Sequence, residues 1–65
     1  MKDYVSVTVI FSDHNGHRQE ISELIHKGRV QQFIDRVMVS GIVIKDSDGI
    51  TGVPPSQIIS VFADW

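Results

Sequence analysis

The segment from Val39 to Val61, VSGIVIKDSDGITGVPPSQIISV, constrains the fold of this chain more than any other. It predicts two strands around an Asp48-Gly49 turn, a corner at Pro54-Pro55 and a further strand. Gly tolerates a positive φ, and Asp tolerates it better than most residues, which suits a tight hairpin. Neither proline can donate a hydrogen bond to a neighbouring strand, so the corner cannot lie inside a central strand. The segment specifies architecture and contains no recognisable catalytic motif.

The 65 residues are enough for one hydrophobic core, so we expect a single compact domain over residues 1–65. A chain of this length buries only about 60% of the surface that its unfolded form exposes, and we expect a stability of about 5 kcal/mol. Cysteine is absent, which excludes disulfide bonds and thiolate zinc sites. Small domains often add stability through a metal or self-association instead.

The apolar residues never run for longer than three positions, as at Val9–Phe11, so the sequence predicts no membrane span. The N-terminus leads directly into an alternating pattern and lacks the apolar region of a signal peptide. These features predict a cytoplasmic protein. The formal net charge is −2, with six Lys and Arg against eight Asp and Glu and no run of either sign. A nucleic-acid-binding protein usually has a basic excess, so this charge argues mildly against one.

The first 21 residues predict a β-hairpin. Residues 4–11 are rich in β-branched and aromatic side chains that alternate, with one set (Val5, Val7, Val9 and Phe11) facing one way and the other (Tyr4, Ser6, Thr8 and Ile10) facing the opposite way. Asn15-Gly16 is the centre of a turn, and residues 17–21 form a plausible return strand. The following segment, residues 20–27, is ambiguous between strand, helix and loop.

One helix is predicted, over residues 28–38. Ile21, Leu24 and Ile25 have helical spacing, but they are out of phase with the next apolar set, Val30, Phe33, Ile34 and Val37. At about 100° per residue the two sets would lie on opposite sides of one helix, so we expect a break near Gly28. Gly41 can serve as the C-terminal cap.

Three further strands are predicted at residues 41–45, 50–53 and 57–63, with a short 3₁₀ turn near Ser56. The order β-β-α-β-β-β gives an α+β domain, either an antiparallel sheet with the helix on one face or a small, partly closed barrel. The last third is similar to the end of SH3-like and Sm-like barrels, where a 3₁₀ turn also precedes the final strand. The mid-chain helix departs from the Sm-like pattern and no RNA-binding motif is matched, so we assign no family.

Sites for catalysis, metals and cofactors are not indicated. His14 and His17 flank the Asn15-Gly16 turn beside Asp13, but groups facing each other across a turn are usually solvated, and no fourth metal ligand is evident. The chain has no nucleophile elbow, phosphate-binding loop or dinucleotide fingerprint. It also has little room for a substrate-sized cleft. We therefore expect no enzyme activity, metal or cofactor.

Two sets of residues are candidates for binding macromolecules. Arg29 and Arg36 are seven residues apart on one helix face with Lys27 nearby, and these three could contact phosphates, although Glu23 and Asp35 dilute the charge. The second set reflects an apolar surplus. The first and last strands, which we take as the outer strands, both carry large apolar groups on both faces, because Ile59, Val61 and Ala63 alternate with Ile58, Ser60 and Phe62. The candidate partner-binding residues are Tyr4, Ile10, Phe62 and Trp65.

The leading hypothesis is a non-enzymatic interaction module that self-associates, as a dimer, and binds another protein. Its small size and lack of catalytic residues resemble many phage-borne or bacterial accessory and regulatory proteins. The alternative is nucleic-acid binding through Lys27, Arg29 and Arg36. A third class, an enzyme assembled across an oligomer interface around His14 and His17, has no support in the sequence.

Overall fold

The computed structural model describes residues 3–64, which form an α+β domain in the predicted order β-β-α-β-β-β. The regular elements are β1 Tyr4–Ser12, β2 Arg18–His26, α1 Val30–Ser40, β3 Ile42–Asp46, β4 Gly49–Val53 and β5 Ile58–Asp64. Two 3₁₀ turns precede α1 and β5, at Lys27–Arg29 and Pro55–Gln57. The predicted 3₁₀ turn near Ser56 is present, although it begins within the proline corner, at Pro55, and not after it.

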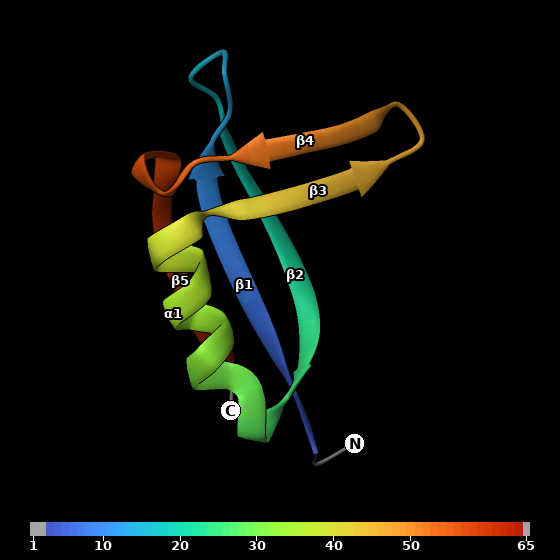
Figure 1. Cartoon of the computed structure of the whole chain (residues 1–65), viewed down its shortest axis with the longest axis vertical. Helices are drawn as coiled ribbons and strands as arrows, with labels where there is room; N and C mark the ends of the chain where they lie inside the picture. Colours follow the sequence, from blue (N-terminus) through green and yellow to red (C-terminus); the bar gives the residue numbers. More distant parts are fainter. Residues whose placement is uncertain (1–2, 65) are drawn as a thin grey trace.

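The described strands form two antiparallel sheets that do not join. One has three strands in the order β2-β1-β5, and the other is the β3–β4 hairpin. The hairpin leaves the end of α1 and crosses in front of β2 at a steep angle, so its backbone cannot continue the ladder of the larger sheet (Figure 1). The sheet is therefore open, and the barrel alternative is wrong. β1 lies in the centre of the sheet, so its assignment as an outer strand is also wrong.

The ambiguous segment of the sequence belongs to β2, which is a longer return strand than predicted. Its nine residues pair one to one with β1, from Ser12↔Arg18 to Tyr4↔His26. In a strand, Ile21 and Ile25 share a face while Leu24 points to the opposite one. The helix-like spacing of these three residues thus comes from a strand with apolar groups on both faces.

α1 begins two residues later and ends two residues later than predicted, because a 3₁₀ turn occupies its expected first turn. In that turn the Gly28 N–H donates to Nδ1 of His26 at 3.1 Å. Gly41 ends the helix as predicted, with φ +79° and its N–H donating to the Val37 carbonyl at 2.9 Å. A positive φ of this kind favours glycine, which lets the chain leave the helix directly into β3.

The core lies between α1 and the inner face of the three-stranded sheet. One buried cluster joins Val9, Phe11, Val37 and Val53, and a second joins Val5, Val7 and Val30. The predicted inward set of the first strand and the predicted apolar stripe of the helix are both confirmed. Phe33 is half-buried and packs against both clusters, so it lies at the margin of the core and not at its centre.

A β-bulge changes the pattern predicted for the last strand. Ile10 pairs with Ser60 but Phe11 pairs with Ile58, so Ile59 has no partner in β1. The bulge moves Ile58 to the side of the core, together with Val61 and Ala63, and leaves Ile59 56% exposed. The strict alternation expected for residues 58–63 is therefore wrong at its first two positions.

Candidate partner-binding surfaces

The face of the sheet that points away from α1, here called the outer face, is defined by the strand register. Cross-strand partners share a face, so the residues opposite Tyr4, Ser6, Thr8 and Ile10 lie on it with them. From β2 these are His26, Leu24, Ser22 and Glu20, and from β5 they are Asp64, Phe62 and Ser60. No described element packs on this face, because α1 and the β3–β4 hairpin both lie on the opposite side (Figure 1).

Large apolar side chains are exposed on the outer face. Leu24 is 66% exposed, Tyr4 52% and Phe62 49%. Ile10, which the sequence also suggested for partner binding, is only 8% exposed. It is flanked by strands on both sides because β1 is central, and that candidate is corrected: Ile10 is not available to a partner. Trp65, the fourth candidate, lies outside the described residues.

Polar contacts order parts of the same face. The hydroxyls of Thr8 and Ser22 form a hydrogen bond of 3.0 Å across β1 and β2. The rings of Tyr4 and His26 meet edge to face with centroids 5.6 Å apart. Such a pair fixes the orientation of both rings. On the outer face, Leu24 of β2 and Phe62 of β5 therefore lie on either side of the small β1 residues Ser6 and Thr8.

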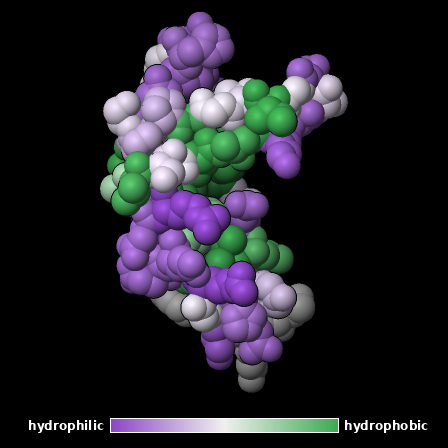
Figure 2. Space-filling model, viewed as in Figure 1, coloured by the Kyte–Doolittle hydropathy of each residue, from purple (hydrophilic) through white to green (hydrophobic). Residues whose placement is uncertain are grey.

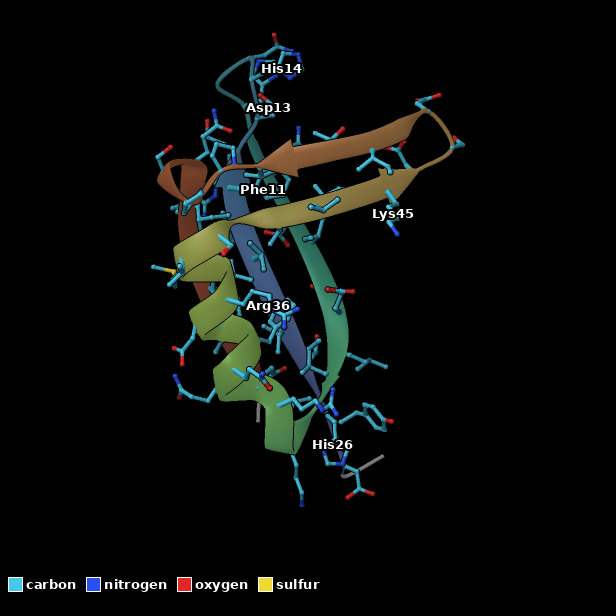
Figure 3. The ribbon with its side chains drawn as sticks, in the orientation of Figure 1. Phe11, Asp13, His14, His26, Arg36 and Lys45 are labelled. Carbon is cyan, nitrogen blue, oxygen red and sulfur yellow. The ribbon has the colours of Figure 1, made fainter. Side chains whose placement is uncertain are left out.

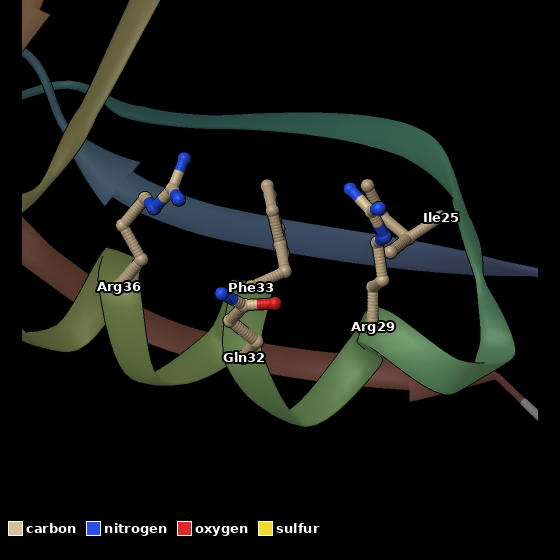
Figure 4. A pocket seen from close by; sticks show the side chains of 5 residues that line it. All are labelled: Ile25, Arg29, Gln32, Phe33 and Arg36. Carbon is tan, nitrogen blue, oxygen red and sulfur yellow. The ribbon is translucent and has the colours of Figure 1, made fainter.

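The second surface lies on the other side of the sheet, in the angle between α1 and β2. A cavity of about 200 Å³ is lined by Ile25 of β2 and by Arg29, Gln32, Phe33 and Arg36, and we call it the arginine groove. Figure 4 shows Arg29, Phe33 and Arg36 projecting from the helical segment towards the sheet, with Phe33 between the two arginines. The groove thus has an apolar centre with a guanidinium group on each side.

The cations of this groove correspond only in part to the predicted set. Arg29 and Arg36 line it together, as their spacing of seven residues predicted, but Lys27 does not. Lys27 lies in the 3₁₀ turn, where its N–H donates to the Asp3 carbonyl at 2.8 Å. The side-chain hydrogen bonds found within residues 3–64 involve neither guanidinium group.

At its hairpin end the arginine groove continues into a larger cavity of about 310 Å³, here called the hairpin cavity. Phe33 and Arg36 line both cavities, and Ile21, Glu23, Ile42 and Val43 line the hairpin cavity alone. Figure 2 shows hydrophobic surface gathered in this hollow, beneath the projecting hairpin and beside the hydrophilic surface of the helix. The carboxylate of Glu23 makes the charge of the hairpin cavity mixed, whereas the arginine groove has cations only.

The β1–β2 turn uses the residues that were considered as metal ligands. Oδ1 of Asp13 accepts from the N–H groups of Asn15 and His17 at 2.9 and 2.8 Å, and Oδ2 accepts from the Gln19 side chain at 3.0 Å. The Gln19 hydrogen bond, followed by that of the His17 N–H, lowers the pKa of Asp13 below its ordinary value. Asp13 and His14 lie at one end of the sheet and His26 at the other (Figure 3). Within residues 3–64 no three His, Asp or Glu side chains are grouped to hold a metal.

Sequence reasoning missed Leu24 and Ile25 as surface residues because their segment was left unassigned. The available signal was the β2 pattern itself, in which Ile21, Glu23 and Ile25 alternate with Ser22 and Leu24. Had residues 18–26 been assigned as one strand, both faces would have followed. Gln32 carried no comparable signal, since a polar residue on a helix is ordinarily solvated.

The chain has no significant match to a protein-family model, to a curated protein or to a solved structure. In the part of the chain that the structure describes, no helix has the length and apolar character needed to cross a membrane.

Proposed function

We propose that this chain is a cytoplasmic, non-enzymatic interaction module that self-associates and binds another protein. The observation that carries the proposal is the outer face, where Leu24, Tyr4 and Phe62 are exposed although the hydrophobic core lies on the opposite face of the sheet. A sheet with one solvated face ordinarily has polar residues there. Three large apolar groups on one such face are typical of a surface that another chain covers.

A second copy of the chain is the occupant that we propose for the outer face. The small hydroxyl residues Ser6 and Thr8 of β1 lie between Leu24 on β2 and Phe62 on β5, and Ser22 lies beside Leu24 on β2. Two such faces related by a twofold axis could place the large residues of one copy over the small residues of the other. Interfaces of this kind use the same patch on both subunits. Burial of an aromatic and a leucine would also add stability to a domain of only 65 residues.

Nucleic-acid binding is the weaker alternative. It is supported by the position of Arg29 and Arg36 in one groove. Against it stand the net charge of −2, the absence of Lys27 from that groove and the apolar centre formed by Phe33 and Ile25. Phosphate-binding surfaces ordinarily gather more cations than two. The arginine groove thus fits a protein partner better than a phosphate backbone.

Analytical ultracentrifugation tests the self-association. We expect a dimer at micromolar concentration, and a Phe62→Ser, Leu24→Ser variant that dissociates at least about 30-fold more readily, because an anchoring aromatic in a buried interface contributes about 2 kcal/mol or more. Ile50→Ser is the matched control, since Ile50 is 69% exposed but lies on the hairpin. The control should leave the dimer unchanged.

Two results would contradict the proposal. One is a monomer of 7.3 kDa at all accessible concentrations. The other is a dimer that Ile50→Ser disrupts as strongly as the outer-face variant does, because the interface would then include the hairpin and not the outer face alone.

A further inference from the structure

The inner side of the sheet is covered unevenly, and this unevenness leaves room for one more helix. α1 packs mainly against β5, which lies behind it in Figure 1, and it contacts β2, on the other side of β1, less closely. Neighbouring strands are about 4.8 Å apart, so β5 and β2 are separated by about 9.6 Å. Packed helices have axes about 8–10 Å apart. A helix lying against α1 would therefore lie over β2.

The residues beneath that position have the chemistry of a helix-binding surface. Ile21 and Ile25 of β2 and Phe33 of α1 line the two cavities, and all three are only half-buried. The β3–β4 hairpin crosses in front of β2 and closes one end, with Ile42 and Val43 on the wall of the hairpin cavity (Figure 1). The cavities, of about 200 and 310 Å³, are of a size to accept one or two apolar side chains each.

The charges of the groove specify the partner further. Arg29 and Arg36 are seven residues apart, which places them about 10 Å apart along the helix axis and on the same side of it. Acidic residues at i and i+7 of a partner helix have the same separation, with apolar residues at i+3 and i+4 falling between them above Phe33. In an extended chain, side chains on one face are about 6.7 or 13 Å apart, which matches this separation less well.

We propose that the arginine groove and the hairpin cavity together bind an amphipathic α-helix of another protein, with its apolar stripe on Phe33, Ile21 and Ile25 and acidic residues paired with Arg29 and Arg36. This inference rests on the proposed function, since it specifies the kind of protein partner. It uses the side of the sheet opposite the outer face, so a dimer could bind two such helices at once.

A synthetic helical probe tests the inference. The probe is a capped, fluorescently labelled peptide of about four turns, with Glu at i and i+7, Leu at i+3 and i+4, and Ala and Gln elsewhere. Its binding to the full chain is measured by anisotropy. We expect Arg29→Gln and Arg36→Gln each to weaken binding about fivefold, as for a partly exposed ion pair of about 1 kcal/mol. Neither side chain belongs to the core, so both variants should remain folded.

Matched controls separate the groove from the overall charge. Lys27→Gln removes one positive charge next to the groove but not within it, and should leave the affinity unchanged. Glu23→Gln should tighten binding, because it removes the one carboxylate of the hairpin cavity. A peptide with Lys in place of both Glu residues should bind at least about tenfold more weakly than the Glu probe.

Several outcomes would overturn the inference. The first two are a Glu probe that shows no saturable binding and a Lys probe that binds as tightly as the Glu probe. The third is a Lys27→Gln variant that weakens binding as much as Arg36→Gln does. The fourth is tighter binding of the Glu probe when prolines hold it in an extended conformation. A single-stranded oligonucleotide that binds more tightly than the peptide, with a salt dependence that Arg29→Gln and Arg36→Gln reduce, would instead support the nucleic-acid alternative. Loss of dimerisation in the Phe62→Ser, Leu24→Ser variant leaves the groove intact, so failure at one surface is distinguishable from failure at the other.

Discussion

The body of the domain and the β3–β4 hairpin are held in different ways. In the body, which comprises β1, β2, β5 and α1, β1 pairs along its length with β2 and along most of it with β5, and α1 packs on one face. The hairpin contributes the buried Val53 and the half-buried Ile42 and Ile44 at its base, whereas Val43 and Ile50 are 64% and 69% exposed. Figure 1 shows its tip projecting away from the rest of the molecule.

Similar apolar segments therefore have different surroundings in the body and in the hairpin. Ile-Val-Ile in β3 and Val-Ile-Phe in β1 have similar composition, but only β1 has strands on both sides. An isolated two-stranded hairpin is marginally stable in water. The orientation of the hairpin therefore depends on the residues at its base, and above all on Gly41, which connects α1 to β3.

The largest effect on this arrangement is expected from Gly41→Ala. Gly41 is buried with φ +79° and ψ −161°, a region that only glycine occupies readily, and an added Cβ would collide with the carbonyl of Val53. We expect a loss of about 3 kcal/mol or more in the free energy of unfolding, a large part of about 5 kcal/mol for such a domain. Chemical denaturation measures it. Gly52→Ala is the control, since a Cβ at Gly52 meets nothing within 4 Å. Equal losses in both variants would contradict the role of the base.

A smaller effect is expected from Val7→Ala in the body, and almost none from Val43→Ala in the hairpin. Val7 is fully buried at 0% exposure, so removing its two methyl groups should cost about 2–3 kcal/mol. Val43 is mostly exposed, and its truncation should change the free energy of unfolding by no more than about 0.5 kcal/mol. Thermal or denaturant unfolding compares the two. A cost at Val43 as large as that at Val7 would show that another part of the protein covers the hairpin.

The smallest expected effect concerns pH and the β1–β2 turn. Because the folded-state pKa of Asp13 is lowered, ionised Asp13 stabilises the fold above its unfolded-state pKa, and this contribution disappears as the pH falls through the folded-state value. Asp13→Asn should therefore be less stable than the wild type at neutral pH, and the difference should vanish in acid. Gln19→Ala should raise the Asp13 pKa towards its ordinary value, as measured by an NMR titration of the carboxyl group. An unchanged pKa in Gln19→Ala would contradict the assigned cause.

Most strands and the helix of the body could be predicted from sequence, because the faces that their local apolar patterns assign to the core are the faces that are buried in the structure. Alternation in residues 4–11, the apolar stripe from Val30 to Val37 and the capping glycine Gly41 each specify an element through short-range chemistry. The strand pairing could not be predicted in the same way. Nothing in residues 42–53 distinguishes strands that extend a sheet from strands that form a separate hairpin, since the same apolar alternation serves both.

The candidate sites were predictable only where one element supplied the residues. Arg29, at the N-cap of α1, and Arg36, within α1, belong to one continuous helical segment, and their spacing alone indicated a shared side. The arginine groove also needs Ile25 from β2, and it forms because α1 lies mainly over β5 and covers β2 only in part. The position of α1 relative to β5 and β2 depends on packing between segments that are distant in the sequence, so local patterns could not predict it. The burial of Ile10 likewise follows from the central position of β1, which only the complete topology reveals.

The bulge at Ile59 has a consequence for solubility at high concentration. β5 is an edge strand, and a regular apolar edge would be a template on which further chains could add strand by strand into a fibril. The extra residue interrupts the repeat of backbone donors and acceptors along this edge, and the other edge, β2, carries Arg18, Glu20 and Glu23. Both edges thus discourage open-ended growth of a fibril by the addition of strands.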